Sequence, residues 1–354
     1  DADNTEAFVS KEAVDYWQEV DLYLGGSEHA TGHLLYSRFW QKFLFDLNLL
    51  PVDEYAKKLI NQGMILGSSA FVYRKKGTQE YITKSRIEGF EVEAIRVDIS
   101  LVNSSDELDT EGLKNWQSQF KEATFVLEDG VYVVGREVEK MSKSKYNVVN
   151  PDQICEQYGA DTLRMYEMFL GPLEQAKPWN TAGISGVYSF LKKLWRLYHP
   201  NETFSVSDKK ASKESLKSLH QTIKKVTEDI ENFSFNTCIS SFMICVNELT
   251  VQKCNERDVL EPLAILLAPF ASHTAEELWE LLGYDSSIGT VAFPIHEPSY
   301  LIESSKNYPV SFNGKMRFTI ELSLKLKPKE IEEIIMNDDR TQQQLQGRTP
   351  KKVI

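Results

Sequence analysis

The sequence predicts a multidomain fold that joins α/β segments to an all-α bundle, and three observations support this class. The N-terminal part sets an apolar run before a Gly-Gly turn and a helical pattern after it. Residues 184–282 hold a succession of amphipathic helical stripes separated by short breaks, which is typical of a helical bundle. Residues 308–345 hold two alternating runs around Asn313-Gly314, followed by helical patterns, which predicts a small α+β module.

Composition and charge narrow the class of protein. The 354 residues are 42% hydrophobic and 26% charged, which is a globular composition with enough apolar material for two or three cores. No apolar stretch reaches membrane-spanning length and the N-terminus lacks a signal-peptide pattern, so we expect a cytoplasmic protein with no membrane partner. The four dispersed cysteines predict reduced thiols and no zinc site. The net charge of −12 argues against simple coating of nucleic acid but leaves room for local basic patches.

The first 66 residues predict a strand–turn–helix unit and a second apolar segment. Residues 20–24 form a short apolar run that meets Gly25-Gly26, and apolar residues then recur at helical spacing from Glu28 to Leu44. Residues 59–66 hold the second apolar segment. In such α/β units, ligands bind at the carboxyl ends of the strands and anionic groups lie near helix N-termini.

In residues 67–135 the helical pattern gives way to short runs of β-prone residues, which predicts a β-rich insertion. Strands are expected where β-prone residues cluster, at 71–73, 90–92, 94–100, 124–127 and 131–134, and one helix is expected within 108–120. After the insertion, Pro151 and Asp161 each stand near the start of a helical pattern, and the bundle follows. We therefore divide the chain into four parts: 1–66 with 136–176, 67–135, 177–296 and 297–354.

The run Lys140-Met141-Ser142-Lys143-Ser144, K-M-S-K-S, is the most informative motif. It places two ammonium groups and two hydroxyls at close spacing, which suits a polyphosphate whose charge grows during a reaction. Taken alone, such a run is more often a solvated basic turn, so its neighbours in the sequence decide the interpretation.

A second cluster lies at residues 23–33, where Y-L-G-G-S-E-H-A-T-G-H packs a Gly-Gly turn, a carboxylate and two histidines into one strand-to-helix junction. The glycines permit close approach of a ligand to the backbone, and Glu28 can accept hydrogen bonds from a ribose diol. His29 and His33 lie one helical turn apart, as in H-E-x-x-H zinc peptidases, but no glutamate follows the first histidine. We therefore expect no protein-bound metal.

Six segments, in this order, resemble the class I aminoacyl-tRNA synthetases, and among them the bacterial leucyl-tRNA synthetases. They are 23–36, 59–64 (L-I-N-Q-G-M), 139–144, 149–171 (V-N-P-D-Q-I-C-E-Q-Y-G-A-D-T-L-R-M-Y-E-M-F-L-G), 267–279 (L-A-P-F-A-S-H-T-A-E-E-L-W) and 308–318 (Y-P-V-S-F-N-G-K-M-R-F). The resemblance covers almost the whole chain. It implies the second half of a Rossmann-type catalytic domain in 1–66 and 136–176, and a β-rich leucine-specific-type insertion in 67–135. It also implies an anticodon-binding-type helical bundle in 177–296 and a truncated α+β tRNA-contacting domain in 297–354.

The resemblance also implies roles for individual residues. Lys143 and Lys140 match the catalytic lysines of a mobile loop that closes over ATP and stabilises charge on pyrophosphate. The implied ATP or adenylate contacts are Gly26, Glu28, Gln62, Met64, Ile65, Ser142 and Ser144. Tyr23 and His33 match the wall of the leucine pocket. The expected tRNA contacts are Arg196, Lys351 and Lys352.

The implied reaction is the ATP-dependent ligation of leucine to tRNA(Leu) through leucyl-adenylate, with Mg2+ accompanying ATP as substrate. The sequence contains neither an H-I-G-H tetrapeptide nor an editing segment. We therefore expect the C-terminal part of a normally monomeric enzyme, inactive alone and prone to self-association. Two alternatives stay open. One is a synthetase for isoleucine, valine or methionine, and the other is a non-catalytic tRNA- or RNA-binding module.

Overall fold

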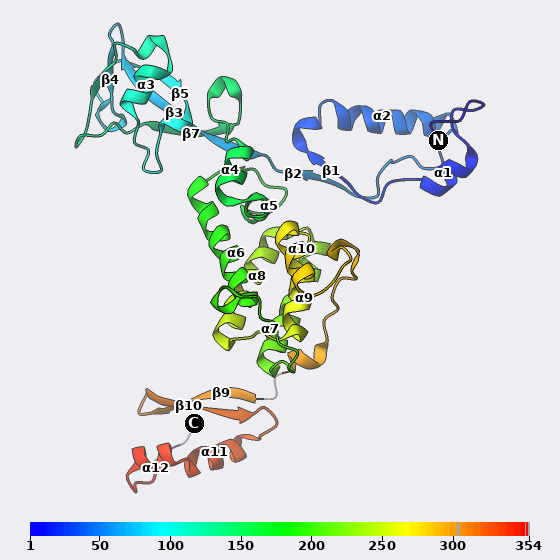
Figure 1. Cartoon of the computed structure of the whole chain (residues 1–354), viewed down its shortest axis with the longest axis vertical. Helices are drawn as coiled ribbons and strands as arrows, with labels where there is room; N and C mark the ends of the chain where they lie inside the picture. Colours follow the sequence, from blue (N-terminus) through cyan, green and yellow to red (C-terminus); the bar gives the residue numbers. More distant parts are fainter. Residues whose placement is uncertain (303–304, 351, 353–354) are drawn as a thin grey trace.

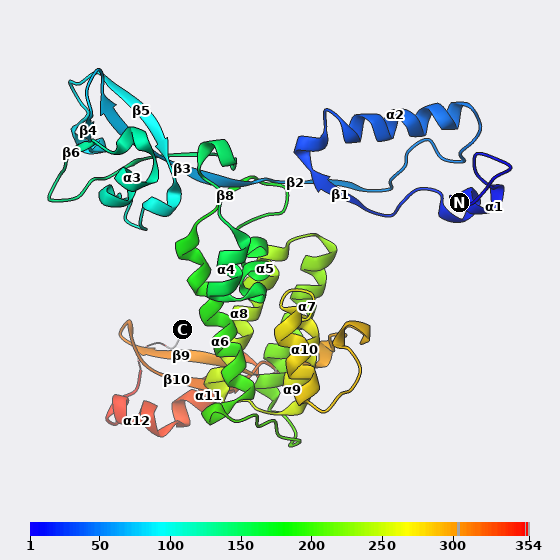
Figure 2. The ribbon, with the colours of Figure 1, turned by 45° about the horizontal axis from the view of Figure 1, so that its top comes forward.

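A computed structural model describes residues 1–302, 305–350 and 352. Figures 1 and 2 show four successive parts: an N-terminal α/β segment, a β-rich body, a helical bundle and a terminal hairpin with two helices. The bundle and the β-rich body each have a hydrophobic core of their own. The predicted combination of α/β segments with an all-α bundle is confirmed.

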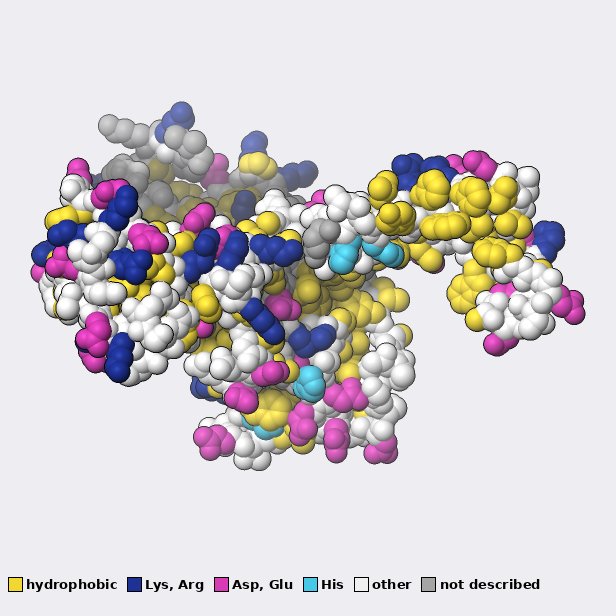
Figure 3. Space-filling model, turned by 90° about the horizontal axis from the view of Figure 1, so that it is seen from above, with side chains coloured by type: hydrophobic (Ala, Val, Ile, Leu, Met, Phe, Trp, Pro, Cys, Tyr) yellow, Lys and Arg dark blue, Asp and Glu magenta, His cyan; other side chains and the backbone are white. Residues whose placement is uncertain are grey.

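The N-terminal segment is a sparse α/β unit. It consists of α1 (Lys11–Trp17), β1 (Tyr23–Gly26), α2 (His33–Asp46) and β2 (Leu59–Gln62), and β1 pairs in parallel with β2. The predicted strand–turn–helix order is confirmed, but the α-helix starts at His33 and not at Glu28. The reason is local, because Ser27–His29 forms a 3-10 turn and Gly32 adopts a non-helical conformation before α2. Figure 3 shows hydrophobic side chains gathered on the surface of this segment.

The β-rich body is built around the long strand β3 (Ile65–Lys75). Strands β5 (Val92–Val97) and β7 (Gly135–Lys140) flank it as antiparallel partners, and β4 (Glu80–Ile82) links it to β6 (Thr124–Val126). The short strand β8 (Lys177–Pro178) returns from beyond the insertion to pair with the start of β3. Helix α3 (Thr110–Trp116) lies within the range predicted for one helix.

Three sequence predictions for this body were wrong in detail. The expected strand 90–92 starts only at Val92, and the expected strand 94–100 ends at Val97, because Asp98 caps a 3-10 turn at Ile99–Leu101. Residues 131–134 form isolated bridges and no strand; this stretch joins the core mainly through the buried side chains of Tyr132 and Val134. Strand β7 was not predicted, because its sequence G-R-E-V-E-K is mostly charged.

The bundle buries the apolar stripes that the sequence predicted. Helices α4 (Pro151–Tyr158), α5 (Ala160–Phe169), α6 (Ile184–Tyr198), α7 (Lys213–Glu231), α8 (Phe235–Gln252), α9 (Arg257–Leu267) and α10 (Ser272–Leu281) share one core. Trp195 of α6 lies at the surface and stacks on His199 with ring centroids 4.0 Å apart. None of the described helices has the length and apolar content that a bilayer span requires.

The C-terminal part forms the predicted hairpin. Strands β9 (Ser305–Phe312) and β10 (Lys315–Ser323) pair antiparallel around Asn313-Gly314, where both residues have positive φ as the tight turn requires. Helices α11 (Pro328–Asn337) and α12 (Asp339–Leu345) follow. Lys352 is exposed, whereas Lys351 lies outside the described residues.

Candidate functional site

The K-M-S-K-S loop leaves the sheet at the end of β7, where Lys140 pairs with Leu66 of β3. Lys143–Lys145 then form one 3-10 turn, which ends at Tyr146 in the left-handed conformation. Both Lys140 and Lys143 are exposed, and neither ammonium group forms an ion pair with any other described residue. The Ser142 and Ser144 hydroxyls lie 2.9 Å apart on the same turn. The loop therefore presents two unneutralised cations and two hydroxyls, which is the chemistry that an anion requires.

A buried asparagine closes the base of this loop. The Asn147 side-chain oxygen accepts a hydrogen bond from the Ser142 backbone N–H at 2.8 Å, and its amide nitrogen donates to the Ser69 hydroxyl at 3.0 Å and the Lys140 carbonyl at 3.3 Å. Asn147 is 0% exposed. Gly67 lies directly opposite, where a Cβ atom would come within 2.6 Å of the Asn147 carbonyl oxygen, so glycine is required at this contact.

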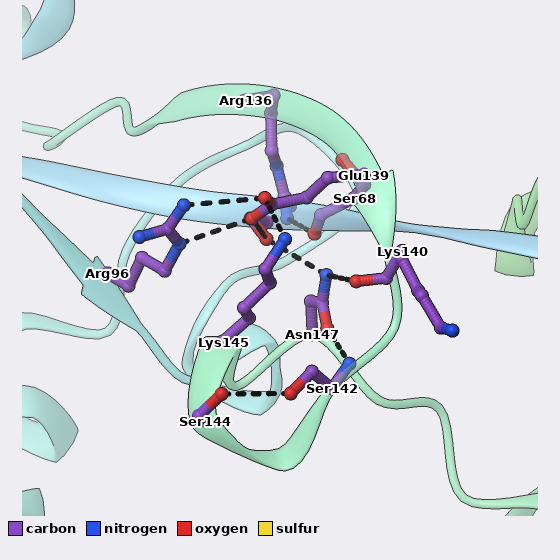
Figure 4. A network of polar contacts seen from close by, with 10 residues as sticks. Ser68, Arg96, Arg136, Glu139, Lys140, Ser142, Ser144, Lys145 and Asn147 are labelled. Atoms are coloured by element: carbon purple, nitrogen blue, oxygen red, sulfur yellow. Dashed lines mark hydrogen bonds and ion pairs between the residues drawn. The ribbon is translucent and has the colours of Figure 1, made fainter.

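A single carboxylate ties the loop to the β-rich sheet, as Figure 4 shows. Glu139 accepts hydrogen bonds from Lys145 within the loop, from the Ser69 hydroxyl on β3, and from Arg96 on β5 at 3.1 Å. Lys145 first, then Ser69 and Arg96, lower the pKa of the Glu139 carboxyl to about 2. Glu139 is therefore an anion throughout the physiological range.

A second cluster forms where β1 and β2 end. A cavity of about 270 Å3 is lined by four of the predicted ATP contacts, namely Gly26, Gln62, Met64 and Ile65. The turn at Gly63 is packed tightly, because its N–H donates to the Leu173 carbonyl at 2.7 Å and an added Cβ atom would lie 1.9 Å from the Gln175 carbonyl oxygen. The close approach of residues 171–177 to β2 thus forms one wall of the cavity.

Two charged residues of this cavity were missed by sequence reasoning. Glu167 projects from α5 and Lys177 from β8, and both are partly buried. Burial raises the pKa of Glu167 against the opposing effect of Arg164, and burial lowers the pKa of Lys177. Both lie inside the 149–171 motif or shortly after it, but no local pattern distinguishes them from the surrounding helical and loop residues.

The expected leucine-pocket residues also meet. The Tyr23 hydroxyl contacts His33 Nε2, and the two rings stack with centroids 5.7 Å apart. The 270 Å3 cavity is lined neither by Tyr23 or His33 nor by any residue of the K-M-S-K-S loop. The Glu28 side chain lies outside the described part of the structure. The fold therefore presents three separate elements, the loop, the cavity and the Tyr23–His33 pair, and not one closed pocket.

Arg196 lies in a larger groove, of about 770 Å3, on the surface of the bundle. The groove also holds the exposed Lys192, whose ammonium group lies 4.0 Å from the centre of the Tyr188 ring, and the stacked Trp195–His199 pair. Exposed cations beside stacked aromatic rings are chemically suited to a phosphate backbone. Within residues 1–302, 305–350 and 352, no group of three His, Cys, Asp or Glu side chains is arranged to hold a metal.

Comparison with known proteins extends these observations. Residues 212–334 match the family described as the anticodon-binding domain of tRNA ligase, and residues 118–179, which include the loop, match tRNA synthetases class I (I, L, M and V). Over the whole chain, the sequence is 69% identical to a leucine–tRNA ligase of Christiangramia forsetii and 64% identical to that of Flavobacterium johnsoniae. The chain spans 37% of the length of each relative.

A solved structure is also similar. It is a ternary complex of a LeuRS from Agrobacterium radiobacter with tRNA and LeuAMS. The match has a TM-score of 0.56 and 26% sequence identity, and it covers 94% of this chain and 36% of that one. Sequence and structure comparisons therefore identify the same group of proteins.

Proposed function

The chain belongs to the leucine–tRNA ligase family, and from that premise we propose that it forms the K-M-S-K-S side of a site that makes leucyl-adenylate and then leucyl-tRNA(Leu). The observation that carries this proposal is the anchored loop with two exposed, unpaired lysines, Lys140 and Lys143. An alternative synthetase for isoleucine, valine or methionine is less well supported, since the relatives matched over the whole chain are leucine–tRNA ligases.

The first step is a displacement at phosphorus. A leucine carboxylate oxygen attacks the α-phosphorus of ATP, the bond to the bridging oxygen breaks, and the electron pair leaves with pyrophosphate. Lys143 stabilises the growing negative charge, Lys140 assists, and the Ser142 and Ser144 hydroxyls donate to phosphate oxygens. Mg2+ arrives with ATP as part of the substrate. A terminal tRNA hydroxyl then attacks the carbonyl carbon of the adenylate and releases AMP.

We assign the other substrates by the chemistry of the neighbouring elements. The adenosine part contacts Gly26, Gln62, Met64 and Ile65 at the cavity, with Glu28 beside the ribose. The leucine side chain packs against the Tyr23–His33 pair. These elements belong to the proposed half of a catalytic domain in 1–66 and 136–176, which the 67–135 insertion interrupts.

The remaining parts of the chain serve the tRNA. Residues 177–296, the part of the bundle that follows α5, contact its phosphates through Arg196, and the 297–354 domain contacts them through Lys351 and Lys352. The exposed positions of Arg196 and Lys352 support this assignment. The alternative of a non-catalytic RNA-binding module predicts tRNA binding without any dependence of pyrophosphate exchange on Lys143.

The test is ATP–pyrophosphate exchange with leucine. We expect the 354-residue chain alone to show no exchange above background, because its sequence contains no H-I-G-H tetrapeptide, the other signature of the ATP site in this family. In the full-length ligase that carries this sequence, Lys143→Ala should lower exchange about 10²- to 10³-fold. The exposed Lys121→Ala on the insertion serves as the control and should leave exchange unchanged.

Two results contradict the proposal. Exchange by the isolated chain would exclude its inactivity, and undiminished exchange by Lys143→Ala would exclude the catalytic role. A gel shift that compares the affinity for tRNA(Leu) with that for other tRNAs, at the same salt concentration, tests the RNA contacts separately. Arg196→Ala should weaken binding of tRNA(Leu) without altering exchange.

A further inference from the structure

We infer that Glu139 and Asn147 are positioning residues that hold the K-M-S-K-S loop to the β-rich insertion, so that the insertion sheet sets where the catalytic lysines lie. The inference rests on the proposed function for its catalytic consequence, but not for its structural part. Neither residue carries the reaction, because both act through the loop: the Asn147 side chain is fully buried, and the Lys140 side chain points away from Glu139 and Asn147 in Figure 4.

Asn147 joins the first residue of the loop to its middle residue. One side chain bonds to the carbonyl of Lys140, where the loop leaves β7, and to the N–H of Ser142, where the 3-10 turn begins. A buried amide that bonds to both a donor and an acceptor of the backbone restrains the residues between them. The third bond of Asn147, to the Ser69 hydroxyl, attaches this closed loop to the central strand β3.

Glu139 provides the second attachment of the loop, and it pairs with only one of the three lysines at residues 140–145. Its carboxylate pairs with Lys145, which is half-buried, whereas Lys140 and Lys143 remain exposed. The same carboxylate pairs with Arg96, so one negative charge separates two positive ones. Without that charge, Arg96 and Lys145 would repel each other across the gap that Glu139 now fills, and the loop would move away from the sheet.

The sheet makes this attachment stiff. Strand β3 pairs with β7 from Leu66 to Phe71 and with β5 from Ala70 to Lys75, so the strands that carry Ser69, Glu139 and Arg96 are fixed in register. The loop is thus an extension of the insertion sheet. A positioning role follows, because a displacement of about 1 Å of a catalytic group costs about 10²-fold in rate.

The structural part is tested by hydrogen exchange on the 354-residue chain. We expect Glu139→Gln and Asn147→Ala to speed exchange of the Ser142 amide by about fivefold or more, while the core strand amide of Val72 keeps its protection. Glu137→Gln is the matched control, because Glu137 is exposed and lies two residues earlier on the same strand. Unchanged exchange at Ser142 in both variants would overturn the inference, whatever the enzyme does.

If Glu139→Gln or Asn147→Ala also speeds exchange of the Val72 amide, that variant has unfolded the sheet and does not test the attachment. Lys145→Met is then used instead, because it removes only the loop partner of Glu139 and leaves the ion pair of Glu139 with Arg96. Faster Ser142 exchange in Lys145→Met supports the attachment, and unchanged exchange excludes it.

The catalytic part is tested in the full-length ligase. Glu139→Gln should lower kcat for pyrophosphate exchange about 10- to 10²-fold with a smaller change in KM for ATP, and Glu139→Asp should restore part of the loss. Glu139→Gln combined with Lys145→Met should cost less than the sum of the two single changes, because both break one attachment. Additive losses would overturn the coupling. If Lys143→Ala has no effect on pyrophosphate exchange, the proposed catalytic function fails. The structural conclusion from amide hydrogen exchange does not depend on that result.

Discussion

The Asp161 carboxylate caps helix α10 from a distance of 113 residues along the chain. It accepts hydrogen bonds from the backbone N–H of Thr274 at 2.6 Å and from the Thr274 hydroxyl at 2.7 Å. It also accepts a longer bond from the His273 backbone N–H. Ala271, the residue that precedes α10, has no side chain able to cap, so Asp161 of α5 satisfies the first turn in its place.

Removing this cap should destabilise the bundle. Asp161→Ala leaves two backbone N–H groups at the start of α10 without an acceptor, and we expect a loss of about 2 kcal/mol in the free energy of unfolding. Chemical denaturation followed by circular dichroism measures it. Glu156→Ala, at an exposed position on α4, is the control and should change the free energy of unfolding by less than about 0.5 kcal/mol. Equal stability of the two variants would show that the cap contributes nothing.

The Glu139 carboxyl should titrate far below an ordinary glutamate. Lys145, Ser69 and Arg96 lower its pKa to about 2 from an ordinary value near 4.5. Its contribution to folding is therefore complete above about pH 4.5 and is lost as the pH falls towards 2. Carboxyl NMR should give this low pKa, and Arg96→Gln should raise it. A titration midpoint near 4.5 in the folded chain would contradict the network.

Two valines on helix α8 provide a direct test of the bundle core. Val246 is 0% exposed and Val251 is 83% exposed. Val246→Ala should cost about 2 kcal/mol of unfolding free energy, through lost burial and a small cavity. Val251→Ala, the same chemical change at the surface, should be nearly neutral. A similar cost at both positions, in denaturant titrations, would mean that α8 does not pack as described.

The apolar face of helix α2 should drive self-association. Phe39 and Trp40 are 60% and 54% exposed, and Leu35, Tyr36 and Phe43 extend the same surface. A patch of this kind is unfavourable in water and favours contact with another apolar surface. We expect light scattering to show concentration-dependent assembly, which the double change Phe39→Ser and Trp40→Ser reduces. Ile295→Ser, at an exposed apolar residue outside α2, should not reduce it, and a monomer at high concentration would refute the prediction.

The four thiols should differ sharply in reactivity. Burial raises the pKa of Cys238 and Cys245 to about 12 and that of Cys254 to about 11, so these three hold little thiolate at neutral pH. Cys155 is the only one of the four that is not buried. A thiol reagent should therefore modify one cysteine quickly in the folded chain, and Cys155→Ser should abolish that phase. Several fast-reacting thiols would indicate an open bundle.

Much of the fold could be predicted because its periodicity is local. The α7 stripe of Leu216, Leu219 and Ile223 repeats at helical spacing and is buried as expected. The Asn313-Gly314 turn likewise identifies its hairpin without any distant contact. Strand β7 was missed because its residues are mostly charged, and its β conformation depends on pairing with β3.

Some residues of the candidate site could likewise be predicted from local motifs, and others could not. The K-M-S-K-S loop and the two segments that carry Gly26 and Gln62 are each visible as motifs of consecutive residues, but only the pairing of β1 with β2 brings Gly26 and Gln62 together. Glu167 and Lys177 carry no such signal, since they join the cavity only through the packing of residues 171–177 against β2.

The sequence by itself determined which groups are present: two loop lysines, two hydroxyls, a Gly-Gly turn and the apolar stripes of a bundle. The tertiary structure alone decided which lysines remain available. Glu139 neutralises Lys145 and leaves Lys140 and Lys143 exposed, because the register of β3, β5 and β7 brings Ser69 and Arg96 to one carboxylate. Strand register depends on pairing across many residues, and no local pattern of side chains specifies it.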